Sequence, residues 1–77
     1  MAIDNERNRV LAALRDQREG ADSSVLSERL TLARESVERH LLYCADYELA
    51  KWRRVRDGSG HAVITDRGLD YLVRQGL

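Results

Sequence analysis

The chain has 77 residues, the length of one small domain, and its 13 Lys and Arg balance its 13 Asp and Glu. A net charge of zero excludes a general basic coat for nucleic acid, so any nucleic-acid contact needs a local patch. The single cysteine excludes an internal disulfide, and no signal-peptide pattern or apolar run of about 20 residues is present. We therefore expect one cytoplasmic domain, residues 1–77, that contacts no membrane.

The first predicted helix spans about Asn5 to Gln17. Asp4 is placed to cap its amino end, and Gly20 to stop the chain from continuing as a helix. The apolar stripe of this helix is Val10, Leu11 and Leu14.

The next stretch predicts two helices joined by a tight corner. A helix that ends at Leu30 starts after an N-cap at Asp22, Ser23 or Ser24, and its apolar residues Leu26 and Leu30 share one face. Thr31 and Leu32 form the corner, and a third helix follows from about Ala33 to Tyr47. This is the helix-turn-helix pattern, in which the later helix enters the DNA major groove.

The third predicted helix has an inner and an outer face. At 100° per residue, its inward set is Ala33, Val37, His40, Leu41 and Cys44. Its outward set is Glu35, Arg39, Leu42, Tyr43 and Asp46. We expect Val37 and Leu41 to be buried with Leu26 and Leu30.

The last third of the chain predicts a β-hairpin followed by a helix. The strands are Leu49–Val55 and His61–Thr65, separated by the turn at residues 57–60. Thr65 or Asp66 then caps a helix to about Gln75, which Gly76 ends. Its apolar stripe is Leu69, Leu72 and Val73. The fold class is mainly α with a hairpin wing, in the order helix, helix, helix, strand, strand, helix.

The segment SVLSERLTLARESVERHLLYCADYELAKWRRV, with a glycine turn and VITDRG after it, resembles a known family. It is similar to the winged helix-turn-helix DNA-binding regulators of bacteria, archaea and phages, of the arsenic-repressor and multiple-antibiotic-resistance-repressor types. The matching positions, within about residues 23–68, are Leu26, Leu30, Leu32, Val37, Arg39, His40, Leu41, Leu49, Thr65 and Gly68. The resemblance implies a sequence-specific transcriptional regulator, a repressor by type, that binds double-stranded DNA. Because a domain of this size makes few base contacts, we expect it to pair two half-sites as a homodimer.

Several positions depart from the family pattern. Thr31 and Glu48 stand where glycine is common, and Ala33 stands where Ser or Thr usually caps the third helix. Glu35 and Glu38 place two negative charges on the helix expected to approach phosphates. A glutamate can, however, accept a hydrogen bond from cytosine N4 in the major groove.

The expected DNA contacts come from the third helix and the wing. The candidates on the helix are Arg34, Glu35, Ser36, Arg39 and Tyr43. The candidates on the wing are Lys51, Arg53, Arg54, Arg56, Ser59 and His61. Because strand residues alternate between faces, Lys51 and Arg53 are expected on one face of the hairpin, and Arg54 and Arg56 on the other.

Each of these contacts has a simpler alternative. The wing arginines can form a solvated strand face that prevents edge-to-edge pairing. Arg39 can pair with Glu35 four residues earlier, and Ser36 can help cap the helix.

The same residues also allow other functions. A winged-helix protein-interaction module, using Leu42, Tyr43 and the hairpin, is the alternative to a DNA-binding regulator. His40 and Cys44 share a helix face, but too few further His or Cys residues exist for a zinc site, so both are expected in the core. No phosphate loop or nucleophile motif is present. We therefore expect no enzyme, no cofactor, no metal and no small-molecule ligand.

Overall fold

The computed structural model describes residues 2–57 and 59–77. Its elements are α1 (Ala2–Asp16), β1 (Ala21–Asp22), α2 (Ser23–Leu30), α3 (Arg34–Asp46), β2 (Ala50–Arg54), β3 (Gly60–Ile64) and α4 (Asp66–Arg74). Among the described residues, no helix has the length and apolar character needed to cross a membrane.

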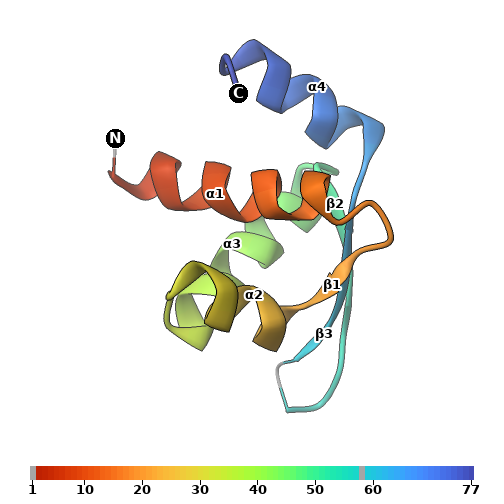
Figure 1. The fold of residues 1–77 in the computed structure, drawn as a ribbon. Coiled ribbons are helices and arrows are strands. Elements are labelled where there is room, and N and C mark those ends of the chain that lie inside the picture. Colours follow the sequence, from red (N-terminus) through yellow and green to blue (C-terminus); the bar gives the residue numbers. More distant parts are fainter. Residues whose placement is uncertain (1, 58) are drawn as a thin grey trace.

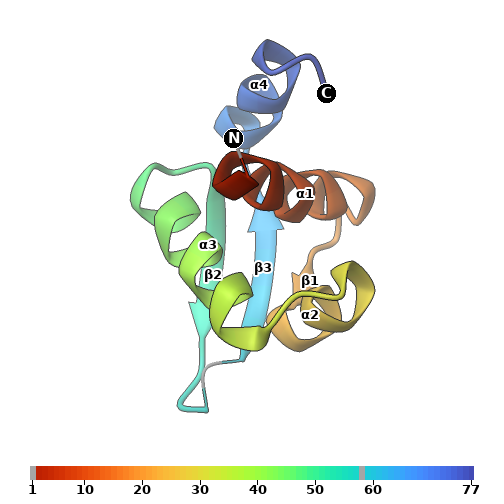
Figure 2. The ribbon, with the colours of Figure 1, turned by 90° about the vertical axis from the view of Figure 1, so that its left-hand side faces the viewer.

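The three strands form one antiparallel sheet in the order β1-β3-β2. Figure 1 shows this sheet nearly edge-on, with α1, α2 and α3 all on one side of it. Figure 2, turned by 90°, shows α2 and α3 in front of the strands and the β2–β3 hairpin extending beyond the helices as a wing. Helix α4 packs mainly on α1, at the end opposite the wing. The predicted winged helix-turn-helix architecture is therefore confirmed.

The hydrophobic core is where the three helices meet the sheet. Its fully buried large side chains are Val10, Leu11, Leu14, Leu26, Val37, Leu41, Cys44 and Leu72. Leu30 and Leu32 are only partly buried and pack against this cluster. The helical periodicity thus placed Leu26, Val37 and Leu41 in the core correctly, whereas Leu30, also expected to be buried, is only partly so.

The start of α2 is held by a side-chain cap. Asp22 is the N-cap, and its Oδ1 accepts hydrogen bonds from the backbone N–H of Ser24 (2.9 Å) and from its hydroxyl (2.8 Å). These bonds, the backbone bond first, lower the pKa of Asp22 below its ordinary value, because they favour the carboxylate.

The corner of the helix-turn-helix is closed without glycine. Thr31 takes the left-handed conformation with φ 54°, which a β-branched residue adopts at a cost in strain. The Ser27 hydroxyl donates a hydrogen bond to the carbonyl oxygen of Leu32 (2.6 Å) across the corner. Glu48 likewise has φ 62° after α3, at the position where the family often has glycine.

The amino-terminal part of the chain differs from its prediction. Helix α1 already includes Asp4, so Asp4 is not its N-cap, and the helix ends at Asp16 rather than Gln17. Gly20, with φ 96°, does not end this helix but turns the chain into β1. Strand β1 was not predicted, because its two residues gain their strand geometry only by pairing with β3.

Two side chains predicted to face inward are exposed. Ala33 is the N-cap of α3, outside the helix, so the helical angle used to place it does not apply. Val73 is 72% exposed, because α4 rests on α1 through Leu72, which is buried, and through Leu69 and Tyr71, which are partly buried. Strand β2 is one residue shorter than predicted at each end, and β3 starts and ends one residue earlier than predicted.

The burial of Leu41 gives the first prediction. Leu41→Ala removes a side chain with no exposed surface and should lower the free energy of unfolding by about 2–5 kcal/mol. The neighbouring Leu42→Ala variant, at a position 46% exposed, is the control and should change it by well under half of that. Urea denaturation followed by circular dichroism measures both, and equal midpoints for the two variants would contradict the burial of the α3 inner face.

The Asp22 cap gives the second prediction. Asp22→Ala should cost about 0.5–2 kcal/mol at neutral pH, because two hydrogen bonds to Ser24 are lost. The folded-state pKa of Asp22 lies below its unfolded value, so its contribution is fully present above that unfolded value. It is lost as the pH falls through the folded-state pKa. The difference in unfolding free energy between Asp22→Ala and the parent should therefore shrink in acid. Glu28→Ala, in the same helix, is the control: it leaves the cap intact and should not show this loss at neutral pH.

Candidate nucleic-acid interface

The outer face of α3 is exposed along its length. Glu35, Arg39 and Leu42 are all solvent-exposed and lie opposite the buried Val37 and Leu41. Glu35 and Arg39, four residues apart, form no ion pair with each other in the described part of the chain. The Arg39 guanidinium is therefore available at the centre of the surface that an incoming partner would meet.

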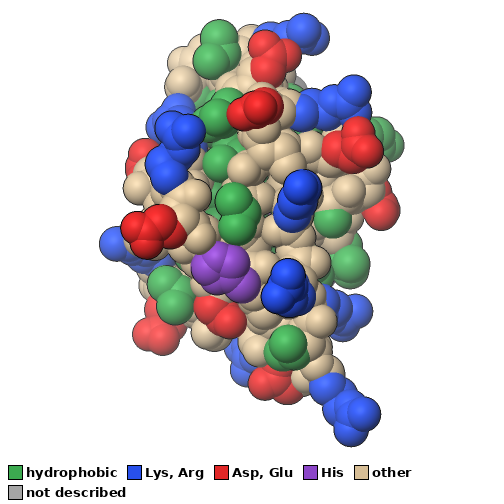
Figure 3. Space-filling view, turned by 90° about the vertical axis from the view of Figure 1, so that its right-hand side faces the viewer, with side chains coloured by type: hydrophobic (Ala, Val, Ile, Leu, Met, Phe, Trp, Pro, Cys, Tyr) green, Lys and Arg blue, Asp and Glu red, His purple; other side chains and the backbone are tan. Residues whose placement is uncertain are grey.

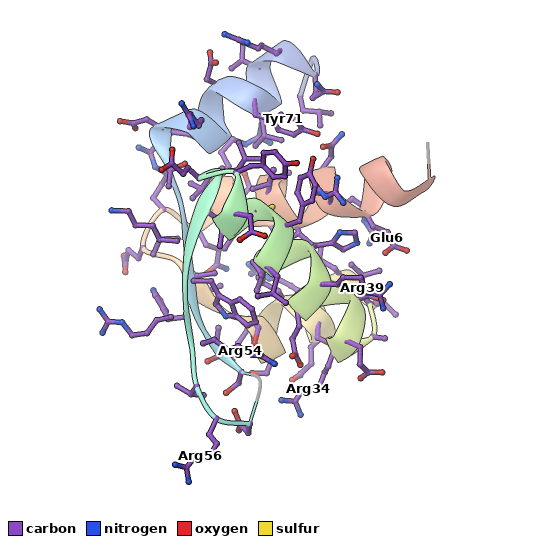
Figure 4. The ribbon with its side chains drawn as sticks, turned by 180° about the vertical axis from the view of Figure 1, so that it is seen from behind. Glu6, Arg34, Arg39, Arg54, Arg56 and Tyr71 are labelled. Carbon is purple, nitrogen blue, oxygen red and sulfur yellow. The ribbon has the colours of Figure 1, made fainter. Side chains whose placement is uncertain are left out.

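One edge of α3 adjoins the wing. Arg54 of β2 points toward α3, and its Nη2 lies 3.5 Å from Oε1 of Glu38. Its guanidinium carbon also lies 5.7 Å from the centre of the Trp52 ring. In Figure 4, Arg54 of the hairpin points toward α3 and Arg34 lies at the end of α3 near the hairpin, while Arg39 lies on the part of α3 further from the hairpin.

The turn of the wing is ordered by its own hydrogen bonds. Oδ1 of Asp57 accepts from the backbone N–H of Ser59 (2.9 Å) and from the Ser59 hydroxyl (2.6 Å). These two bonds, the hydroxyl bond first, lower the pKa of Asp57, and the positive charge of Arg34 lowers it further. Arg56 stands at the tip of the hairpin and points away from the body of the protein. The wing thus presents Arg56 at its tip and Arg54, paired with Glu38, at the end of β2 nearest the turn.

The face of the sheet away from α3 carries a separate set of basic residues. In the register of β2 with β3, Lys51 lies beside Val63 and Arg53 beside His61. These four residues, together with Trp52, line a shallow depression of about 670 Å³. Figure 3 views this face and shows Lys and Arg side chains next to a histidine and hydrophobic side chains. The alternation of Lys51 and Arg53 against Arg54 is as predicted.

The His61 side chain makes a hydrogen bond within the protein. Its Nε2 lies 2.9 Å from the carbonyl oxygen of Glu19, to which it donates a hydrogen bond. This bond fastens β3 to the loop after α1, so His61 has less freedom to meet a partner than Lys51 or Arg53.

The other edge of α3, toward α1, is aromatic. The guanidinium of Arg7 stacks 3.5 Å above the Tyr43 ring, and the Tyr43 and Tyr47 rings are 4.5 Å apart. Ser36, half-buried, lies on this same side of α3 by its helical angle. The candidate contacts of α3 are therefore spread over three surfaces: Arg34 at the wing edge, Glu35 and Arg39 in the centre, and Ser36 and Tyr43 at the α1 edge.

The structure adds two contacts that the sequence did not reveal. Glu38 was expected only to place a negative charge on α3, yet it pairs with Arg54, sixteen residues later. His40, 6% exposed, has its Nε2 3.2 Å from Oε1 of Glu6 in α1. Both contacts join different elements, so no local spacing could have predicted them.

His40 and Cys44 belong to the core, as predicted. Burial raises the pKa of the Cys44 thiol to about 11, so the thiol stays protonated at neutral pH. Among the described residues, no cluster of His, Cys, Asp and Glu has the composition of a metal site.

Comparison with known proteins identifies the fold. No family model and no curated protein sequence matches the chain. Among solved structures it is similar to the PcaV transcriptional regulator of Streptomyces coelicolor, solved with its natural ligand, at 26% identity and a TM-score of 0.78 over 92% of the chain. A candidate DNA-binding protein of Ralstonia eutropha JMP134 has 23% identity and a TM-score of 0.77 over 90% of the chain. The antimony-specific repressor AntR has 22% identity and a TM-score of 0.75 over 94% of the chain.

PcaV and AntR are longer than this chain. The alignment spans 51% of PcaV and 63% of AntR, but 91% of the Ralstonia protein. A fourth match, AbsC of Streptomyces coelicolor, is described as a MarR family transcriptional regulator and has a TM-score of 0.73. The resemblance of this sequence to the winged helix-turn-helix transcriptional regulators is thus confirmed in its structure.

Proposed function

We propose that the chain is a transcriptional regulator that binds double-stranded DNA, with α3 in the major groove and the β2–β3 hairpin along the phosphate backbone. The observation that carries this proposal is the continuous surface formed by the exposed outer face of α3 and the wing beside it. This surface brings Arg34, Arg39, Arg54 and Arg56 to one side of a protein whose net charge is zero. The solved structures similar to it include transcriptional regulators.

The arginines divide into two roles by position. Arg39 stands at the centre of the outer face of α3, where a guanidinium can donate two hydrogen bonds to O6 and N7 of guanine. Arg54 and Arg56 stand on the wing, which meets the sugar-phosphate backbone. Contacts of the first kind select sequence, and those of the second kind fix position and depend on salt.

The acidic residues of α3 favour selectivity over affinity. Glu35 is exposed near the amino end of α3, where it can accept from cytosine N4. On a duplex without a matching donor, the same carboxylate repels phosphates. A zero net charge therefore suits a protein with weak non-specific binding.

We further propose that the regulator acts as a homodimer. A single domain of this size makes few base contacts, and two half-sites raise both affinity and selectivity. The exposed apolar residues of the carboxyl-terminal segment, Val73 and Leu77, lie on the end of the molecule away from the wing. A dimer formed there leaves α3 and the wing free for DNA.

No small-molecule ligand is part of the proposal. PcaV was solved with its natural ligand, but this chain spans 51% of PcaV. The proposed DNA contacts use only α3 and the wing of this chain.

A second candidate function rests on the aromatic edge of α3. Leu42, Tyr43 and Tyr47 are all exposed, next to the stacked Arg7. Aromatic residues and arginine are typical of protein interfaces. A protein partner that covers Leu42 would also cover the outer face of α3, so this function and DNA binding exclude each other on one molecule.

The roles of Arg39 and Arg54 give a prediction for DNA binding. A duplex selected from a random pool serves as the cognate site, and a scrambled duplex as the reference. Arg39→Ala should weaken cognate binding by about 1–3 kcal/mol and reduce the discrimination between bases at one position of the site. Arg54→Ala should weaken both duplexes and reduce the slope of log K against log salt by up to about 0.9.

The measurement is fluorescence anisotropy over a series of salt concentrations. Lys51→Ala, on the opposite face of the sheet, is the matched charge control for Arg54→Ala and should change the slope less. Failure of the parent chain to bind any duplex at low salt would refute DNA binding and leave the protein-interaction function as the better account.

A separate prediction concerns self-association. Val73→Glu should shift a dimer toward monomer in sedimentation equilibrium, because it places a charge on the exposed apolar end of α4. Leu42→Glu should leave the sedimentation behaviour unchanged, because Leu42 lies on the DNA-facing side of α3. Dissociation by Leu42→Glu alone would instead assign the outer face of α3 to protein contact.

A further inference from the structure

Charges on α3 and on the wing face charges of opposite sign on the other element. Arg34 and Glu38 are four residues apart on the edge of α3 that adjoins the hairpin. On the wing, Arg54 lies 3.5 Å from Glu38. Asp57, also on the wing, is close enough to Arg34 for that positive charge to lower its pKa. Two of the cations on the proposed DNA-binding surface, Arg34 and Arg54, are therefore each faced by an acid of the protein itself.

The pair between Glu38 and Arg54 is the better defined of the two. The Glu38 side chain is only 22% exposed, so water screens it less than a fully exposed carboxylate. Arg54 extends from a fixed part of the hairpin, because the neighbouring Trp52 donates its indole N–H to the carbonyl oxygen of Gly60 across the strands (3.2 Å). Gly60 is itself buried, with φ 144°, and a Cβ at this position would overlap the Arg53 backbone. The paired strands of the wing thus hold Arg54 near Glu38.

We propose that Glu38 is a specificity-determining residue that makes the phosphate contact of Arg54 conditional on the DNA sequence. This inference rests on the proposed function. In the free protein the carboxylate and the guanidinium neutralise each other. On DNA, a phosphate competes with Glu38 for the same guanidinium.

The outcome of that competition depends on what Glu38 meets. On an unrelated duplex, moving Arg54 to a phosphate leaves the half-buried Glu38 carboxylate without its partner and close to negative charge. Arg54 has five N–H donors and can reach a phosphate while keeping Glu38, but the carboxylate then still lies near the phosphate. On a duplex that offers cytosine N4 at this edge of α3, the amino group replaces the guanidinium as donor to Glu38. Only such a duplex lets Arg54 contact a phosphate while Glu38 keeps a hydrogen-bond donor.

The test removes the charge of Glu38 and keeps its shape. Glu38→Gln should tighten binding to the scrambled duplex by about two- to five-fold, the range expected for a partly exposed ion pair, and tighten the cognate duplex less or weaken it. The ratio of cognate to scrambled affinity should therefore fall. Asp46→Asn removes one negative charge from the same helix at a position away from the wing, and should change both affinities by the same factor.

A second arm tests that Glu38 acts through Arg54. In the Arg54→Gln background, Glu38→Gln should no longer raise affinity for the scrambled duplex, because the guanidinium that it releases is absent. Without DNA, the NMR signal of the Arg54 side-chain Nε–H should shift in Glu38→Gln and stay in place in Asp46→Asn. This readout tests the ion pair independently of DNA.

The outcomes separate this inference from the proposed function. If the parent chain binds DNA but Glu38→Gln and Asp46→Asn change cognate and scrambled affinities alike, the role of Glu38 is overturned and DNA binding stands. If Glu38→Gln still tightens scrambled binding in the Arg54→Gln background, Glu38 acts by general repulsion and the inference fails. If the parent chain binds no duplex at low salt, the proposed function and this role of Glu38 both fall.

Discussion

The structure depends on the burial of the inner face of α3. Val37, Leu41 and Cys44 have no exposed surface, and His40 is 6% exposed and bonded to Glu6 of α1. Because these contacts fix the rotation of α3 about its axis, they also decide which residues face outward. A rotation by one residue, 100°, would turn a different set of side chains toward a DNA groove. The candidate site is therefore a consequence of core packing.

The elements that follow a local rule could be predicted from the sequence. The 3–4 spacing of apolar residues located α2 and α3 closely, and the glycine turn located the hairpin. Strand β1 could not be predicted, since its two residues are extended only because they pair with Ala62 and His61, forty residues away. Val73 fits a helical stripe, yet α4 packs mainly on α1 and buries a narrower face than the stripe implies.

The candidate site shows the same division. The pleat of β2 was enough to separate Lys51 and Arg53 from Arg54, because side chains alternate along any strand. The partner of Arg54 was not predictable, since the crossing of the wing past α3 brings Glu38 within 3.5 Å. Sequence spacing instead allowed a pair between Glu35 and Arg39, which the structure does not form.

The balance of charge then has a structural meaning. Thirteen acidic residues do not simply cancel thirteen basic ones over the whole surface, because specific acids lie against the cations of α3 and the wing. A protein with free wing arginines would gain affinity for every duplex, since phosphate contacts are independent of sequence. Acids beside those arginines lower the sequence-independent part of the affinity, so base contacts determine which duplex is bound. In a domain with room for few base contacts, weakening the non-specific term is an effective route to selectivity.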